Sequence, residues 1–135
     1  MMKKSSHIIL INKKGELLFQ LRDNKSEIDY PGHWGLIGGE SDMDENPLDC
    51  LKREINEEIP GCEITYIIKL GNLLNDNSLM NIFFGKTDDS EELLNKRLNE
   101  GVKVQFFNFS EIKNLKIPNH IKEFILENKW LLSDS

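Results

Sequence analysis

Acidic residues crowd into one short stretch of this 135-residue chain, shortly after a pair of glycines. Glu54, Glu57 and Glu58 directly follow Arg53, and Glu45 lies between this group and the glycines. Carboxylate oxygens are the ligands that Mg²⁺ prefers, usually together with the phosphates of a substrate. Adjacent glycines let the backbone approach an ion or a phosphate closely. The spacing therefore predicts a site that holds a divalent metal ion against a phosphate group.

A helix must carry these acids if they are to act together. Asn46 is typical of an N-cap, Pro47 suits the first helical position, and Pro60-Gly61 should end the helix. Because each helical residue advances by about 100°, the three carboxylates fall on one stripe. A second, apolar stripe is formed by Leu48, Leu51, Ile55 and Ile59. We expect the apolar stripe to pack on a sheet and the acids to face an open groove.

Repulsion among the three carboxylates must be offset. Like charges one turn apart destabilise a helix by a few tenths of a kcal/mol per pair, which a bound cation would relieve. Arg53 lies one turn before Glu57 and can hold that carboxylate in one orientation. A charge run of this kind is more often only a solvated helix face. The complete spacing from Gly39 to Glu58, after a strand and an N-cap, favours the metal site.

The composition predicts one globular domain over residues 1–135, with 39% hydrophobic and 30% charged residues. A net charge of −6 argues against a long nucleic-acid partner, which clustered Lys and Arg would bind. Cys50 and Cys62 form no CxxC pair, which favours a reducing, cytoplasmic location. No apolar run approaches the length of a membrane span, so no membrane partner is expected.

The other elements should alternate between strands and helices around this region, as in the α/β class. Strands are expected at 7–11, 16–22, 34–37, 62–70, 79–86 and 102–109. The first two should form a hairpin, 23–32 a surface loop, and 72–77 an Asn-rich turn. A last helix is expected at 119–130, and the pattern at 88–101 fits a helical turn or a long loop.

Taken together, the acidic stretch resembles the signature of the Nudix hydrolases, G-x5-E-x7-R-E-U-x-E-E-x-G-U, where U is a bulky aliphatic residue. The matching positions are Gly39, Glu45, Arg53, Glu54, Ile55, Glu57 and Glu58. The W-G-L-x-G-G sequence at 34–39 and Asn99-Glu100-Gly101 extend the resemblance to about residues 5–130. Pro60 replaces the last signature glycine, and Gly61 follows one place late, so the turn after the helix should differ.

This resemblance implies a mixed β-sheet sandwiched between helices, the α/β/α arrangement of the family. It also implies that Glu54, Glu57 and Glu58 bind Mg²⁺, or alternatively Mn²⁺, with the Gly39 carbonyl contributing. Arg53 would orient Glu57. Glu45 would brace the helix and its flanking loops or join the metal shell through water.

Glu100 matches a loop acid that some family members use as a metal ligand or general base. The alternative for Glu100 is an ordinary acid on an exposed loop. The predicted catalytic set is therefore Arg53, Glu54, Glu57 and Glu100. Gly38, Gly39 and Arg22 are predicted to contact the substrate phosphates.

The activity implied is Mg²⁺-dependent hydrolysis of a pyrophosphate bond in a nucleoside diphosphate linked to another group. The small size favours nucleoside triphosphates, including oxidised ones such as 8-oxo-dGTP, and leaves nucleotide sugars and ADP-ribose open. The alternative hypotheses are a non-catalytic nucleotide-binding domain and an isoprenoid diphosphate isomerase. An isomerase would need a cysteine that faces the alkene, and neither cysteine is well placed for this. The partner would be a small molecule, and the protein a monomer or homodimer.

Several aromatic residues and histidines have ordinary structural interpretations. Trp34 should belong to the core, and Phe106, Phe107 and Phe109 to a buried strand. His7, His33 and His120 have no metal-ligand spacing and are expected to be exposed or to cap helices.

Overall fold

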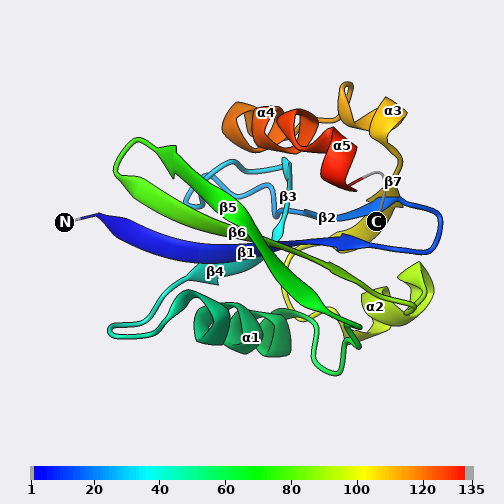
Figure 1. Cartoon of the computed structure of the whole chain (residues 1–135), viewed down its shortest axis with the longest axis horizontal. Coiled ribbons are helices and arrows are strands. Elements are labelled where there is room, and N and C mark those ends of the chain that lie inside the picture. Colours follow the sequence, from blue (N-terminus) through cyan, green and yellow to red (C-terminus); the bar gives the residue numbers. More distant parts are fainter. Residues whose placement is uncertain (1, 133–135) are drawn as a thin grey trace.

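A mixed sheet with helices on both faces forms the body of the protein in the computed structural model, which describes residues 2–132. Helix α1 (Pro47–Glu58) lies on one face of the sheet, and α4 (Asn119–Glu127) and α5 (Lys129–Leu132) lie on the opposite face (Figure 1). Two shorter helices are α2 (Glu91–Arg97) and α3 (Phe109–Ile112). The predicted α/β/α sandwich is confirmed.

The sheet has seven strands within the described residues, and its main path runs β3-β2-β1-β6-β5. The strands are β1 (Lys3–Ile11), β2 (Leu17–Leu21), β3 (Trp34–Gly35), β4 (Ile37–Glu40), β5 (Ile67–Asn75), β6 (Ser78–Lys86) and β7 (Lys103–Phe107). β1 and β6 pair in parallel, whereas the other pairs are antiparallel. β4 pairs with residues 5–8 of β1 and lies against α1.

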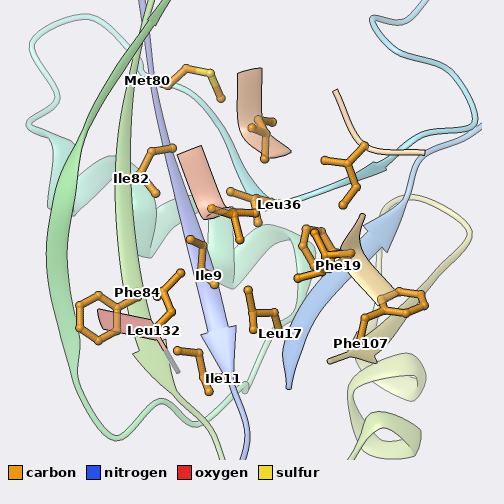
Figure 2. Close-up of a cluster of buried hydrophobic side chains, with 14 residues drawn as sticks. Ile9, Ile11, Leu17, Phe19, Leu36, Met80, Ile82, Phe84, Phe107 and Leu132 are labelled. Carbon is orange, nitrogen blue, oxygen red and sulfur yellow. The ribbon is translucent and has the colours of Figure 1, made fainter. Parts of the chain in front are cut away.

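Two hydrophobic clusters of the described residues fill the spaces on either side of the sheet. Ile9 and Ile11 of β1 point toward α4 and α5, whereas Ile8 and Leu10 point toward α1. Figure 2 shows the first cluster, in which Ile82 of β6 lies on one side of the β1 side chains and Phe19 of β2 on the other. Alternation along a strand sends successive side chains to opposite faces, so β1 holds the two helical layers together.

Several predicted boundaries are wrong for a physical reason. The strand predicted at 62–70 is β5, which begins at Ile67 and continues to Asn75. The turn therefore occupies only Asp76 and Asn77, with Asp76 at a φ of 52°. The predicted strand at 34–37 splits at Leu36, because β3 pairs with β2 and β4 pairs with β1.

The late part of the chain also differs from the prediction. Phe109 does not continue β7 but begins α3, because Asn108 caps this helix in a capping box with Glu111. The predicted helix at 119–130 ends at Glu127 and resumes as α5 after Asn128. The ambiguous segment at 88–101 contains α2, with Ser90 as its N-cap.

The aromatic residues and histidines have mixed outcomes. Trp34 packs edge-on against Phe107 in the core, as predicted. The expectation that His7 is exposed or caps a helix is wrong: it lies within β1, and its Nδ1 atom is buried without a hydrogen-bond partner. Burial, reinforced by the positive charge of Arg22, lowers the pKa of His7 to about 4.

None of the helices described between residues 2 and 132 combines the length and apolar character needed to cross a membrane.

Candidate metal and phosphate site

Helix α1 begins and ends as its sequence signals predict. The Asn46 side chain accepts a hydrogen bond from the Asp49 backbone N–H at 2.8 Å, and Pro47 occupies the first turn. Leu51, Ile55 and Ile59 pack toward the sheet, whereas Leu48, predicted for the same stripe, is exposed. The helix therefore presents its acidic side to β4 and to the loops around it.

Glu58, one of the three acids expected along a groove, is almost completely buried. Its side chain is turned under β4, where Oε2 accepts a hydrogen bond from the Gly38 backbone N–H at 2.9 Å. Only 3% of the residue is exposed. Burial, and then the neighbouring carboxyl group of Glu100, raise the pKa of Glu58 to about 9. A nearby cation would favour the ionised form of this group.

Glu54 lies against the backbone of the second glycine. A Cβ atom on Gly39 would lie 2.5 Å from Oε1 of Glu54, closer than any side-chain contact tolerates. The first glycine is constrained from the other side, because Gly38 has a φ of 146° and its Cβ would collide with the carbonyl oxygen of Ser6. Burial raises the pKa of Glu54. Both glycines thus allow β4 to fit between β1 and the acids.

Arg53 connects the surrounding carboxylates. It donates to Glu45 at 2.8 and 3.0 Å, to Glu54 at 3.2 Å and to Glu57 at 3.3 Å. A further hydrogen bond, to the Glu40 carbonyl at 2.9 Å, ties the helix to the end of β4. The Arg53 hydrogen bonds lower the pKa of Glu45 to about 2. In this structure Glu45 braces the loop before α1, since it also accepts the Asp42 N–H.

A cleft of about 300 Å³ opens where α1, β2, β4 and the loop before β7 meet. It brings together six of the predicted residues: Arg22, Gly38, Gly39, Glu54, Glu58 and Glu100. The other three, Glu45, Arg53 and Glu57, lie beside it on the same network of hydrogen bonds. Residues far apart in the sequence thus converge on the acids of α1.

Sequence reasoning missed some residues that line this cleft, namely Gln20, Asp23, Ile28 and Glu40. Gln20 is the informative omission. It is a buried polar residue, 4% exposed, and its Nε2 donates to the Glu100 carbonyl at 2.6 Å. A signal was available, because a single amide side chain interrupts the apolar strand L-L-F-Q-L.

A second cavity, of about 720 Å³, lies between the sheet and the start of α4. Its lining includes His7, Tyr30 and His120, and Tyr30 forms a ring contact with His120 at 5.6 Å. Arg22 lines both cavities, and its Nε donates to the Asp29 carbonyl at 2.8 Å. Arg22 therefore lies where the two cavities adjoin.

The donor set of the cleft suits a hard cation only in part. Among residues 2–132, no three His, Cys, Asp or Glu side chains converge closely enough to form a ready-made cage. Mg²⁺, however, is usually held by one or two carboxylates, substrate phosphates and waters, and does not need a protein cage. Burial, and then the carboxyl group of Glu100, raise the pKa of Glu58, and a nearby cation would offset both effects. The residues present therefore fit a metal ion that is shared with a phosphate.

The sequence profile of the NUDIX domain matches residues 1–127. The chain belongs to the Nudix family. Nudix enzymes hydrolyse pyrophosphate bonds in small nucleotide-derived substrates and use divalent metal ions, and membership identifies this chain as a Nudix pyrophosphohydrolase. Comparison with curated protein sequences gives no significant match.

Solved structures show the same Nudix fold at low sequence identity. The MutT protein of Methanosarcina mazei Go1 has a TM-score of 0.77 and 21% identity, over 93% of this chain and 91% of its own. A mutT/nudix family protein from Listeria innocua has a TM-score of 0.72 and 19% identity, over 96% of each chain. The C-terminal domain of mouse MUTYH, solved in complex with human PCNA, has a TM-score of 0.71 and 10% identity, over 96% and 88%.

Proposed function

We propose that this Nudix protein is a Mg²⁺-dependent hydrolase of nucleoside triphosphates, with Mn²⁺ as the alternative ion. The observation that carries the proposal is the single cleft in which Glu54, Glu58 and Glu100 meet the paired glycines and Arg22. Acids to bind metal and a cation to bind phosphate are the two requirements for pyrophosphate chemistry, and the cleft supplies both.

The metal would be held by the carboxylates of Glu54, Glu57 and Glu58, with the Gly39 carbonyl as a further oxygen ligand. When bound, such an ion polarises a phosphoryl oxygen and lowers the pKa of water. Arg53 keeps Glu54 and Glu57 oriented through the hydrogen bonds described above.

Substrate phosphates would lie between the glycine backbone of β4 and Arg22. The guanidinium of Arg22 neutralises phosphate charge at the wall shared by the two cavities. Glu54 or Glu100 accepts the proton of the attacking water, because both carboxylates line the cleft. Attack on phosphorus then releases a nucleotide and the phosphorylated leaving group.

The second cavity supports a nucleoside-containing substrate. Its volume of about 720 Å³ falls in the range of about 300–1,000 Å³ typical of small-molecule sites. Tyr30 and His120, whose rings contact each other in its lining, would pack against a planar base, and the shared Arg22 connects this cavity with the phosphate cleft. An oxidised base such as that of 8-oxo-dGTP belongs to this substrate class; nucleotide sugars and ADP-ribose are the alternatives.

The isomerase reading is disfavoured by both cysteines. Cys50 is fully buried, and burial raises the pKa of Cys62 to about 11, which leaves its thiol protonated at neutral pH. We further propose a cytoplasmic protein that acts as a monomer or homodimer on a small molecule, with no nucleic-acid or membrane partner.

The test is ³¹P NMR of a panel of nucleoside triphosphates, nucleotide sugars and ADP-ribose, incubated with the protein and Mg²⁺. We expect a nucleoside triphosphate to be cleaved, and the Glu57→Gln variant to lose at least about 100-fold in kcat. Lys52→Ala is the matched control, because Lys52 is exposed on the same helix. Hydrolysis by Glu57→Gln at the wild-type rate would refute the proposal.

A further inference from the structure

The segment Asn99-Glu100-Gly101 is held by hydrogen bonds to two elements, the end of α1 and β2. We propose that Asn99 and Gln20 are positioning residues that set Glu100 against Glu58 for the hydrolytic reaction. The inference rests on the proposed function, since it concerns the same cleft. It assigns to two residues outside the Nudix signature a role that acts through Glu100.

The first attachment uses the end of the helix. The last carbonyl groups of an α-helix have no N–H partners within the helix. Asn99 supplies the missing donors: its backbone N–H bonds to the Glu58 carbonyl at 2.8 Å and its Nδ2 to the Glu57 carbonyl at 3.2 Å. The two residues that carry the acidic side chains thus also hold the loop through their backbones.

The second attachment comes from the sheet. Gln20 donates to the Glu100 carbonyl at 2.6 Å, and the Val102 N–H donates to the Leu21 carbonyl at 2.8 Å. Gly101 has a φ of 78°, and a Cβ there would lie 2.9 Å from the Gln20 side chain and from the Leu21 carbonyl. Only glycine fits at this position, so the loop can lie directly on β2.

These attachments fix where the carboxyl group of Glu100 lies. Hydrogen bonds hold the loop before Glu100 to α1, at Glu100 to Gln20, and after it to β2. Its side chain lines the same cleft as Glu58 and is close enough to interact with that carboxyl group. A displacement of about 1 Å in a reacting group can lower a rate roughly 100-fold, so this placement matters for turnover.

The experiment is a double-mutant cycle. Asn99→Ala and Gln20→Met each remove a side-chain amide, and each is measured alone and combined with Glu100→Gln. We expect each single variant to lower kcat roughly 10- to 100-fold with little change in KM. In the Glu100→Gln background, Asn99→Ala or Gln20→Met should leave kcat almost unchanged, because the carboxylate that Asn99 and Gln20 position is no longer present.

A purely structural role gives a different result. If Asn99→Ala and Gln20→Met lower kcat by the same factor with and without Glu100→Gln, the proposal is overturned. Wild-type kcat in both single variants would overturn it equally. Asn56→Ala is the matched control, because Asn56 is exposed on α1 and lies outside the cleft lining.

Hydrogen exchange provides a readout that is independent of activity. In Asn99→Ala we expect the amides at residues 99–102 to exchange at least about fivefold faster, while those in the middle of α1 are unchanged. Unchanged exchange at 99–102 would contradict the inference. If the wild-type protein cleaves no pyrophosphate bond, the proposed function fails, and the exchange rates still decide whether Asn99 holds the loop.

Discussion

The carboxylate of Glu54 lies directly over the Cα atom of Gly39, in the space that any other side chain at position 39 would need. The contact joins β4 to α1 at the cleft, which Gly39 and Glu54 both line. Carboxylates and backbone carbonyl groups are both oxygen ligands of the kind that Mg²⁺ accepts. A larger residue at position 39 would therefore have to displace the Glu54 carboxylate.

Gly39→Ala should displace the Glu54 carboxylate and weaken metal binding. We expect the affinity for Mn²⁺, measured by electron paramagnetic resonance, to fall roughly 10- to 100-fold. Gly71→Ala is the control, because a Cβ at Gly71 meets Phe124 at an ordinary distance of 3.6 Å, away from the cleft. Equal Mn²⁺ affinities in wild type and Gly39→Ala would show that Glu54 is not a ligand.

Glu58 should make the stability of the metal-free protein depend on pH. Its pKa is about 9 in the folded protein and 4.5 in the unfolded chain, so unfolding between these values releases a proton. The free energy of unfolding should therefore fall between pH 4.5 and 9, by up to about 1.4 kcal/mol per pH unit from this group.

The measurement is urea unfolding at pH 5, 7 and 9 in the presence of a chelator. Glu58→Gln keeps an oxygen that can accept the Gly38 N–H but does not titrate, so the difference between the two proteins isolates Glu58. Parallel pH dependences in wild type and variant would contradict the assignment. In the same range, Mn²⁺ affinity of the wild type should rise with pH, since binding must expel the proton.

His7 should have the opposite effect on stability below pH 6.5, where its contribution falls as the pH falls. Its pKa is lowered from 6.5 to about 4 by burial, by Arg22 and by His120, so the folded protein keeps the ring neutral. Stability from this group is complete above pH 6.5 and is lost as the pH falls toward 4. We expect His7→Gln to have a shallower loss of melting temperature between pH 6.5 and 4; a slope equal to that of wild type would contradict this.

The helix and its acids could be predicted from the sequence because their signals are local. Asn46, Pro47 and the apolar repeat lie within a few residues of one another and determine where α1 begins and which side is buried. The same argument could not show that Glu58 is buried. Helical angles place a side chain on a stripe, but the covering strand β4 decides whether that stripe is exposed.

Other features depend on residues distant in the sequence. The hydrogen bond between Gln20 and Glu100 joins residues 80 positions apart, so no local sequence pattern predicts it. The end of β5 was missed because its Asn-rich sequence is typical of a turn, whereas pairing with β6 keeps it extended through Asn75. His7 could have been placed in the sequence analysis, since alternation puts it on the same face of β1 as the buried Ile9.

The central claim is that the acids of α1 bind a divalent ion that holds a pyrophosphate. The most direct test is a crystal of the protein soaked with Mn²⁺ and a non-hydrolysable nucleoside triphosphate, with anomalous diffraction recorded for manganese. We expect an anomalous peak between the phosphates and the carboxylates of Glu54, Glu57 and Glu58. Density for the nucleotide without a peak there, or the three carboxylates directed into bulk solvent, would contradict the account.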